Sequence, residues 1–411
     1  MSASATEYRF DPADPELIRD PYPVYRRLQA AESLHWAAGG YWVASRHADV
    51  REVLSSGSFG QGEFVHNIQL FYPPEFDVMA QSAYRWLSEV FVMQDPPRHT
   101  RLRKLVTHAL TPKRIADMQP RIESITRALL ERVLPLKRME VLQDFAYLLP
   151  TLVMFDMLGV EEEERTPERM TQLTRAVADA FIVFETRALS EAELARANAQ
   201  MDFLYEYFGA LFDRRRADPR GDLTSALGQP SEDGDQLSRR ELVTVVIAMF
   251  GAGFETTAHM IANGVLTLHK HPQQWARLVA DPALAANVVE EVLRFESSLQ
   301  ASYRTALADA QVFGKAVKSG ERVLCILGAA NRDEGVFRSP DDFDITRKDI
   351  RILSFGGGIH HCVGQQLARL EGRVAFTALA QALPDMQVDT ASAQWRPGFL
   401  FRGLTGLQAR W

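Results

Sequence analysis

The sequence predicts a mainly α-helical protein with a minor β component. Apolar residues recur with a period near 3.6 over residues 115–133 and 194–217, as expected for amphipathic helices. Short β-like runs lie at residues 41–44 and 322–326, and strand-like residues return near the C-terminus. No internal repeat or low-complexity linker divides the chain, so we expect a single domain over residues 1–411 with a large hydrophobic core.

Composition and charge exclude several classes of protein. The sequence holds 46 Lys and Arg against 53 Asp and Glu, and the net charge of 46 − 53 = −7 argues against general binding to nucleic acid or anionic membranes. The first residues lack the apolar run of a signal peptide, and the most apolar helical stretch, residues 242–254, is shorter than the roughly 20 residues of a membrane helix. We therefore expect a soluble, cytoplasmic protein.

The elements follow one another in a readable order. A helix pattern at residues 23–31 adjoins the first β-like run, and the pattern from Asp95 to Leu268 is mostly helical. The loosest stretch, residues 228–236, reads as a surface loop. A last helix is expected over residues 363–383, followed by strands from residue 399.

One helix is unusually long. Ser238 and Glu241 form a capping-box pattern, and no strong helix breaker follows until Pro272. This predicts a helix of about 33 residues, or roughly 50 Å at 1.5 Å per residue. Gly251 and Gly253 lie in its interior, where each costs about 1 kcal/mol relative to Ala. Close packing against another helix, or close approach of a ligand, would explain both glycines.

The two cysteines, Cys325 and Cys362, are too few for a disulfide framework or a four-thiolate zinc site. Cys325 lies in an apolar run and reads as a small buried hydrophobe. Cys362 follows a glycine-rich loop and precedes a helix, whose N-terminus favours an anionic sulfur. Such a thiolate can be a nucleophile or a metal ligand, and a haem-iron thiolate explains more of the surrounding residues than a catalytic triad does.

The loop resembles a known signature. Phe355, Gly358, His360, Cys362 and Gly364, with Leu367 and Ala368 beyond, are spaced as in the haem-binding signature of the cytochrome P450 family. The resemblance implies the mainly α cytochrome P450 fold, with haem b between the long distal helix and the helix after the cysteine loop. It makes Cys362 the iron ligand and places Phe355 and Gly364 beside the sulfur. His361 departs from the apolar residue usual at its position.

Further motifs resemble the same family in the same order along the chain. Glu291 and Arg294 are spaced as a helical acid–base pair, which in the family is buried and completed by a downstream arginine, here Arg347 or a neighbour. Ser297 and Ser298 stand where the family usually has proline after this helix, so the shape of the following turn is open.

Residues 252–256 resemble the family's oxygen-activation motif on the long helix. The resemblance makes Glu255 and Thr256 the catalytic acid–alcohol pair that relays protons to iron-bound oxygen, a task that suits a carboxyl and a hydroxyl group. The small residues Ala252 and Gly253 would leave room for dioxygen. A surface pairing of Glu255 with His259 is the simpler alternative.

Cations are expected for the haem propionates. His99 and Arg103 are four residues apart on a predicted helix and can reach one partner from the same face. Arg304 and His360 match further family positions that contact propionates. Each of these side chains could instead be a solvent-exposed base or a core histidine.

The chain carries no flavin or dinucleotide fingerprint and no cysteine set for an iron–sulfur cluster. Electrons must therefore come from a separate protein, and the resemblance implies that this is a ferredoxin with its reductase, supplied by NAD(P)H. We expect a basic docking patch for this acidic partner, formed by side chains near the thiolate: Arg98, Arg101, Lys104, Arg369 and Arg373. The other partners expected are dioxygen and a hydrophobic small molecule, with the protein acting as a monomer.

The candidate substrate-pocket residues are largely apolar, which favours a hydrophobic organic substrate. We expect the reaction to belong to secondary metabolism. They are Phe71, Phe76, Phe181, Val245, Met249, Ala252, Leu299, Leu400 and Phe401. The leading hypothesis is a monooxygenase that hydroxylates or epoxidises such a substrate. A peroxide-driven peroxygenase, a haem-thiolate isomerase and a non-catalytic haem-thiolate sensor are alternatives, and a cysteine hydrolase is a more distant one. The Glu255–Thr256 pair favours the monooxygenase.

Overall fold

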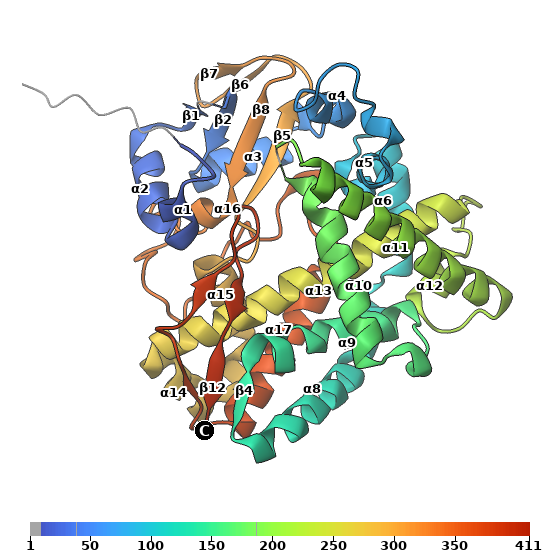
Figure 1. Cartoon of the computed structure of the whole chain (residues 1–411). Helices are drawn as coiled ribbons and strands as arrows, with labels where there is room; N and C mark the ends of the chain where they lie inside the picture. Colours follow the sequence, from blue (N-terminus) through green and yellow to red (C-terminus); the bar gives the residue numbers. More distant parts are fainter. Residues whose placement is uncertain (1–9, 38, 186) are drawn as a thin grey trace, which may run out of the picture. The chain divides into compact units, whose positions relative to one another are not determined.

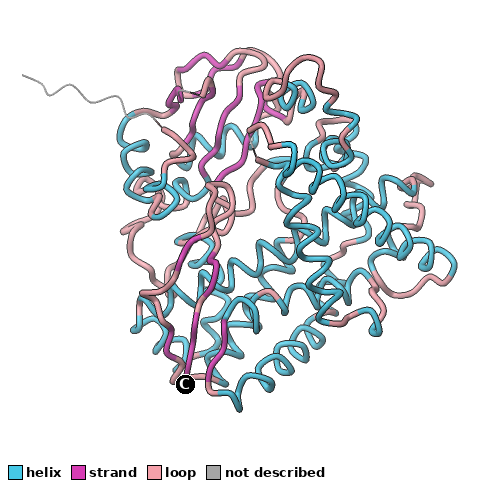
Figure 2. The backbone as a smooth tube through the Cα atoms, in the orientation of Figure 1, coloured by secondary structure: helices cyan, strands magenta, loops and turns pink. Residues whose placement is uncertain are grey.

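The computed structural model describes residues 10–37, 39–185 and 187–411. The N-terminal residues 1–9, where the sequence predicts no signal peptide, lie outside the described residues. The chain forms two compact units, of which unit 1 comprises the residues up to Gly60, Thr126–Tyr147 and Thr256–Trp411, and unit 2 comprises Gln61–Ile125 and Leu148–Glu255. Figure 2 shows that helices dominate the described chain, as the sequence predicts.

Unit 1 holds all the strands found in the described part of the chain, together with several helices. Its helices are α1 (Pro15–Arg19), α2 (Tyr22–Ala31), α3 (His47–Ser55), α14 (Pro272–Ala280), α15 (Ala285–Phe295), α16 (Leu327–Ala330) and α17 (Gln365–Ala382). Its strands are β1 (Leu34–Ala37), β2 (Tyr41–Ala44), β3 (Phe59–Gly60), β4 (Arg138–Glu140), β5 (Ala301–Ala306), β6 (Ala310–Val312), β7 (Lys315–Val317), β8 (Arg322–Ile326), β9 (Gln387–Val388), β10 (Gln394–Trp395), β11 (Leu404–Gly406) and β12 (Gln408–Arg410).

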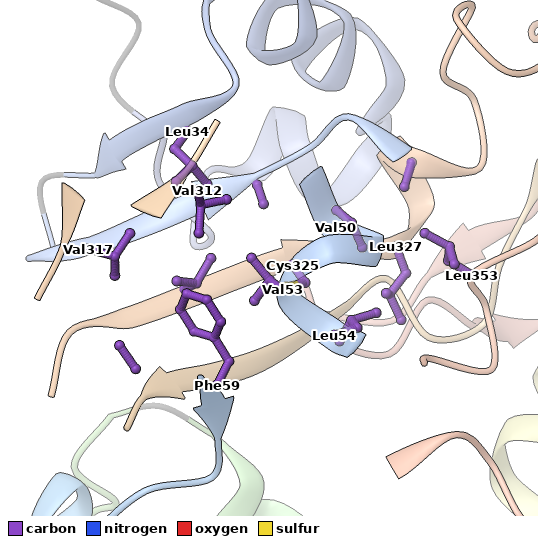
Figure 3. Close-up of a cluster of buried hydrophobic side chains, with 14 residues drawn as sticks. Leu34, Val50, Val53, Leu54, Phe59, Val312, Val317, Cys325, Leu327 and Leu353 are labelled. Carbon is purple, nitrogen blue, oxygen red and sulfur yellow. The ribbon is translucent and has the colours of Figure 1, made fainter. Parts of the chain in front are cut away.

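The main sheet of unit 1 has the strand order β1-β2-β8-β5-β3 (Figure 1). Strands β2 and β8 run parallel, with Ala44 opposite Cys325, whereas β5 and β8 run antiparallel. Side chains alternate between the two faces of a strand, and β8 separates two cores in this way. Leu324 and Ile326 join one apolar cluster, while Cys325 joins the other together with residues of α3 (Figure 3).

The smaller sheets hold the chain's C-terminus. Strand β12 pairs with β4 and β9, and β11 pairs with β10. The strands expected from residue 399 onward are therefore present, although they begin at Leu404. The preceding residues form a turn that is hydrogen-bonded to residues 298–300, just before β5.

Unit 2 is helical. Its helices are α4 (Phe64–Gln69), α5 (Ser82–Glu89), α6 (Arg98–Ala109), α7 (Pro112–Asp117), α9 (Leu148–Leu158), α10 (Pro167–Ala180), α11 (Glu191–Ala217) and α12 (Leu223–Leu227). Helix α8 (Gln119–Val133) begins in unit 2, and the period that predicted one helix over residues 115–133 breaks at Met118 between α7 and α8. The core contains stacked aromatic rings, such as Phe155 on Phe250 with centroids 5.7 Å apart.

The long helix is present as α13 (Arg239–Lys270). Both arms of its capping box form, because the Ser238 amide donates to the Glu241 carboxylate at 2.9 Å and the Glu241 amide donates to the Ser238 hydroxyl at 3.3 Å. Among the described helices, α13 alone has the length and hydropathy of a membrane span, but 72% of its most apolar window is buried inside the protein, as in the core helix of a soluble protein.

The expected acid–base pair lies in the core of unit 1. Both side chains, Glu291 and Arg294, are fully buried, and two hydrogen bonds of 2.7 Å join them. Arg347 completes the group, with its Nε 3.2 Å from a Glu291 oxygen, as predicted. Arg294 also donates to the carbonyl of Asn331, whose side chain bonds Ser354 beside the cysteine loop. The network therefore fixes the segment that leads into that loop.

Candidate active site

The cysteine loop is held against α3 by backbone contacts. The Cys362 amide donates to the Phe355 carbonyl at 2.9 Å, which closes the loop. Gly356 and Gly358 have φ of 69° and 62°, a region that favours glycine. A Cβ on Gly358 would lie 2.1 Å from the Leu54 carbonyl oxygen, so only glycine allows this approach to α3.

Cys362 lies just before the first turn of α17, and its side chain is exposed. Gly364 caps this helix, and a Cβ there would lie 4.0 Å from the Cys362 sulfur. The N-terminal amides of an 18-residue helix stabilise negative charge on a sulfur in this position. Cys325, by contrast, is fully buried in the cluster of Figure 3, and burial raises the pKa of its thiol to about 12. This confirms that Cys325 is a small core residue.

The middle of helix α13 has an accessible stripe between buried residues. Ala252 is exposed, and Met249, Glu255 and Thr256 are half-buried, whereas nearly every residue from Thr257 to Leu268 is buried. The spacing of three and four residues places these four side chains on one face of the helix. Three residues of the expected oxygen motif, Ala252, Glu255 and Thr256, therefore lie on the face that the middle of α13 leaves accessible.

The two glycines in this part of α13 are explained by packing. A Cβ on Gly251 would lie 2.4 Å from the Phe181 ring, and a Cβ on Gly253 would lie 2.5 Å from the Met154 sulfur. The expectation that Gly253 leaves room for dioxygen is thus replaced by a packing role, and Ala252 is the small residue on the accessible face.

The candidate propionate ligands are placed on two elements and the cysteine loop. His99 and Arg103 lie on α6 as expected, and the side chain of His99 is buried. Arg304, on β5, is only 4% exposed and donates to the Ser302 hydroxyl at 3.0 Å and the Tyr303 carbonyl at 2.7 Å. His360 is half-buried within the cysteine loop.

The candidate pocket residues differ in exposure. Phe71, Phe76, Phe181, Met249, Leu299, Leu400 and Phe401 are half-buried and Ala252 is exposed, but Val245 is 1% exposed and lies in the core. In unit 2, Phe76 stacks on Tyr72 and Phe181 stacks on Trp86. In unit 1, Leu299 and Phe401 form an isolated β-bridge.

Three members of the expected basic docking patch are engaged within the protein. Arg101 forms ion pairs with Asp235 and Glu241, and Lys104 pairs with Asp233 at 2.6 Å. Arg369 pairs with Glu290 and lies over the Phe355 ring at 4.5 Å. Their charge is therefore partly neutralised by the loop at residues 228–236, by the start of α13 and by α15, and the sequence pattern did not reveal these partners.

Sequence reasoning missed several buried polar groups of unit 1. His259 accepts a hydrogen bond at 2.7 Å from Arg396, which lies 137 residues further along the chain. The carboxylate of Glu371 is fully buried on α17, and burial raises its pKa well above the usual range. Spacing along the chain gives no signal for the contact between His259 and Arg396, because the two residues belong to different elements, and it does not reveal the burial of Glu371.

The cysteine loop and the candidate propionate ligands fit a thiolate-ligated haem. The described part of the chain brings together no group of three or more His, Cys, Asp or Glu side chains that could hold a metal ion by themselves. It does offer the exposed thiol of Cys362, on a loop whose approach to α3 requires glycine at position 358. It also offers the buried guanidinium of Arg304, which suits an anionic partner. The haem ring supplies four nitrogen ligands to its iron, so the protein needs to add only this one cysteine sulfur.

Comparison with known proteins gives a consistent result. The family model of cytochrome P450 matches residues 64–389. The biotin biosynthesis cytochrome P450 of Bacillus subtilis is 33% identical over 402 residues, covering 96% of this chain and 97% of the relative. Cytochrome P450 CYP107DY1 of Priestia megaterium is 35% identical, covering 93% and 94% of the two chains.

Solved structures agree with the sequence relatives. P450BioI in complex with an acyl carrier protein that bears hexadec-9Z-enoic acid superposes with a TM-score of 0.87 at 33% identity, covering 97% of this chain and all of the other. With its exposed thiol, its buried acid–base pair and this coverage, the chain belongs to the cytochrome P450 family and is a haem-thiolate monooxygenase of the bacterial type.

Proposed function

We propose that Cys362 is the cysteine that binds the haem iron. The observation that carries this proposal is the exposed Cys362 side chain at the start of α17, on a loop whose glycines contact α3, while the other cysteine is buried in the core. Phe355 and Gly364 flank the sulfur in this assignment. The N-terminal amides of α17 would stabilise its negative charge.

The propionates of the haem would be held by His99, Arg103, Arg304 and His360. Cationic guanidinium groups and imidazole N–H groups are the donors that carboxylates prefer, and hydrogen bonds to charged groups are worth about 1.5–3 kcal/mol each. Burial of Arg304 strengthens such a bond, because little water competes for the guanidinium.

When bound, the thiolate-ligated haem supplies the activation of dioxygen and its insertion into a C–H or C=C bond. The proposed task of this chain is to deliver protons. The Thr256 hydroxyl can donate its proton and accept another, and the Glu255 carboxyl can replace it from solvent. Both side chains are half-buried on the accessible face of α13, which suits groups that must reach both water and a closed site.

We propose a hydrophobic organic substrate, with a role in secondary metabolism. The accessible candidate residues are apolar, including Met249, Leu299 and Phe401. Named relatives act on or bind hydrophobic molecules of different shapes: one is a vitamin D(3) 25-hydroxylase at 35% identity, and CYP267B1, at 34% identity, was solved with myristic acid. These relatives support the hydrophobic class and leave the shape of the substrate to experiment.

The electron donor is proposed to be a ferredoxin with its NAD(P)H-dependent reductase, in the cytoplasm. Arg98 and Arg373, two members of the expected docking patch, are exposed. We expect reversal of Arg98 to Glu to slow reduction more than reversal of Arg101, whose charge is already balanced by two carboxylates.

The test is a reconstituted turnover assay. The protein, a bacterial ferredoxin, its reductase and NADPH are incubated with isotopically labelled dioxygen and a panel of fatty acids, steroids and macrolides. A product that carries one labelled oxygen atom supports the monooxygenase. Product formed with hydrogen peroxide alone, and none with dioxygen and NADPH, would establish the peroxygenase alternative instead.

A further inference from the structure

Two turns of unit 1 are joined by a short ladder of hydrogen bonds. The Gln300 amide donates to the Leu400 carbonyl at 2.9 Å, and the Arg402 amide donates to the Ser298 carbonyl at 2.8 Å. Leu299 and Phe401 face each other in an antiparallel bridge between these bonds. Both are candidate pocket residues, so the ladder fixes the position of one relative to the other.

A buried ion pair lies at the end of this ladder. Arg402 donates to the Glu296 carboxylate at 2.5 Å, and the Tyr22 hydroxyl donates to the same oxygen at 2.6 Å. The Arg402 guanidinium also donates to the Ile18 carbonyl at 2.8 Å and lies over the Trp395 ring at 3.6 Å. Glu296 and Arg402 are 8% and 7% exposed, so the pair is shielded from water and has one geometry.

Asn263 ties both turns to α13. Its side-chain amide donates to the Arg402 carbonyl at 2.9 Å and reaches the Glu296 carbonyl at 3.4 Å. Asn263 is fully buried and lies seven residues, or about two helical turns, after Thr256. The Asn263 side chain therefore connects the helix that carries the proposed relay to the two turns.

Polar bonds also shape the first turn where the family usually has proline. The Ser297 hydroxyl donates to the Leu299 carbonyl at 2.9 Å, and the Gln300 side chain donates to the Ser297 carbonyl at 2.6 Å. Of residues 296–301, only Leu299 is more than slightly accessible. The turn is thus constrained by side-chain hydrogen bonds and presents a single apolar side chain.

We propose that the Glu296–Arg402 ion pair, with Asn263, is a specificity-determining clamp that sets the separation and orientation of Leu299 and Phe401 and so selects substrates by width. The clamp residues are positioning residues, because they act through the two apolar side chains. The proposal rests on the assignment of Leu299 and Phe401 to the substrate pocket.

The pair has features of a positioning device rather than of a simple stabiliser. Replacing a buried ion pair by apolar residues is often neutral for stability, so a buried pair is weak evidence for a stabilising role. Its directional bonds do, however, define one relative position for the segments that carry it. Here those segments are the end of α15 and the residues next to Phe401, and both are joined to the bridge within three residues.

The test compares two azole probes that bind haem iron and differ by one phenyl ring, imidazole and 4-phenylimidazole. Dissociation constants are measured from the visible spectrum for the haem-loaded wild type, Arg402→Gln and Arg402→Lys. In Arg402→Gln, 4-phenylimidazole should lose about tenfold in affinity, equivalent to about 1.4 kcal/mol, whereas imidazole, which has no phenyl ring to contact the wall, keeps its affinity. Arg402→Lys retains a cation for Glu296 and should lie between.

Arg215→Gln is the matched control. Arg215 is also buried, at 3% exposure, and pairs with Asp222 and Glu161 instead of with the clamp. It should lower stability without changing the ratio of the two dissociation constants. The backbone amides of residues 300 and 402 should exchange their hydrogens faster in Arg402→Gln than in the wild type. In Arg215→Gln their exchange should not accelerate.

The outcomes are distinguishable. An unchanged ratio and unchanged exchange in Arg402→Gln would overturn the clamp, even if the variant is less stable. A wild type that shows no azole shift and no haem-thiolate spectrum would overturn the proposed function itself, and the clamp with it.

Discussion

Replacing Glu291 by Ala should strongly destabilise unit 1. The substitution leaves Arg294, which is fully buried, without its carboxylate. Removing one partner of a buried ion pair costs about 3–5 kcal/mol. Arg294 keeps its hydrogen bonds to the Pro340 and Asp342 carbonyls, at 2.8 and 2.9 Å, so we expect the lower end, about 3 kcal/mol. Glu291→Gln retains an acceptor without the charge and should cost about 2 kcal/mol.

The assay is urea unfolding of the haem-loaded proteins, followed by far-ultraviolet circular dichroism. The control is Arg26→Ala, which removes an exposed ion pair with Asp341 and should change the free energy of unfolding by at most about 1 kcal/mol. Because Arg294 connects through Asn331 to Ser354, the Glu291 variants should also bind less haem. The reasoning would be refuted if Glu291→Ala cost no more than Arg26→Ala.

Three further predictions address the relay, the core histidine and the long helix. Thr256→Ala should keep the haem-thiolate spectrum but divert electrons from product to peroxide, and full coupling of NADPH to product would reject the relay. Burial, and then Arg396, lower the pKa of His259 from 6.5 to about 3, so the unfolded chain takes up this proton at a higher pH than the folded chain and the free energy of unfolding falls as pH drops from 6.5 toward 3. His259→Asn should flatten this part of the pH dependence measured by urea unfolding, and an unchanged slope would contradict the prediction. Gly251→Val should lower the urea midpoint by the equivalent of about 1–3 kcal/mol, because its side chain would overlap the Phe181 ring. A neutral effect would show that Phe181 can move away from α13 without cost.

Local signals predicted much of the fold. The capping box at Ser238 and the proline at position 272 predicted both ends of α13, because these residues act within one turn of the helix. The spacing of Glu291 and Arg294 predicted their pair for the same reason. The break at Met118 was not predicted, since the apolar period continues through it.

The candidate site was predicted less completely. Cys362 could be singled out from its loop, where its side chain is exposed, and its role as the iron ligand stays a prediction. The pairing of Glu296 with Arg402 could not be predicted, because the two residues are 106 positions apart and only the folded chain brings them together. The neutralisation of Arg101 by the loop at residues 228–236 has the same cause. Charge at one position in a sequence says little about the partner that the fold supplies.

The assignment of Cys362 as the iron ligand is tested most directly by the carbon-monoxide difference spectrum of the reduced protein. The wild type and Cys325→Ala should both show the strongly red-shifted band of a haem thiolate, because Cys325 lies in the core cluster. Cys362→Ser should lose this band. Retention of the band in Cys362→Ser, or its loss only in Cys325→Ala, would contradict the account.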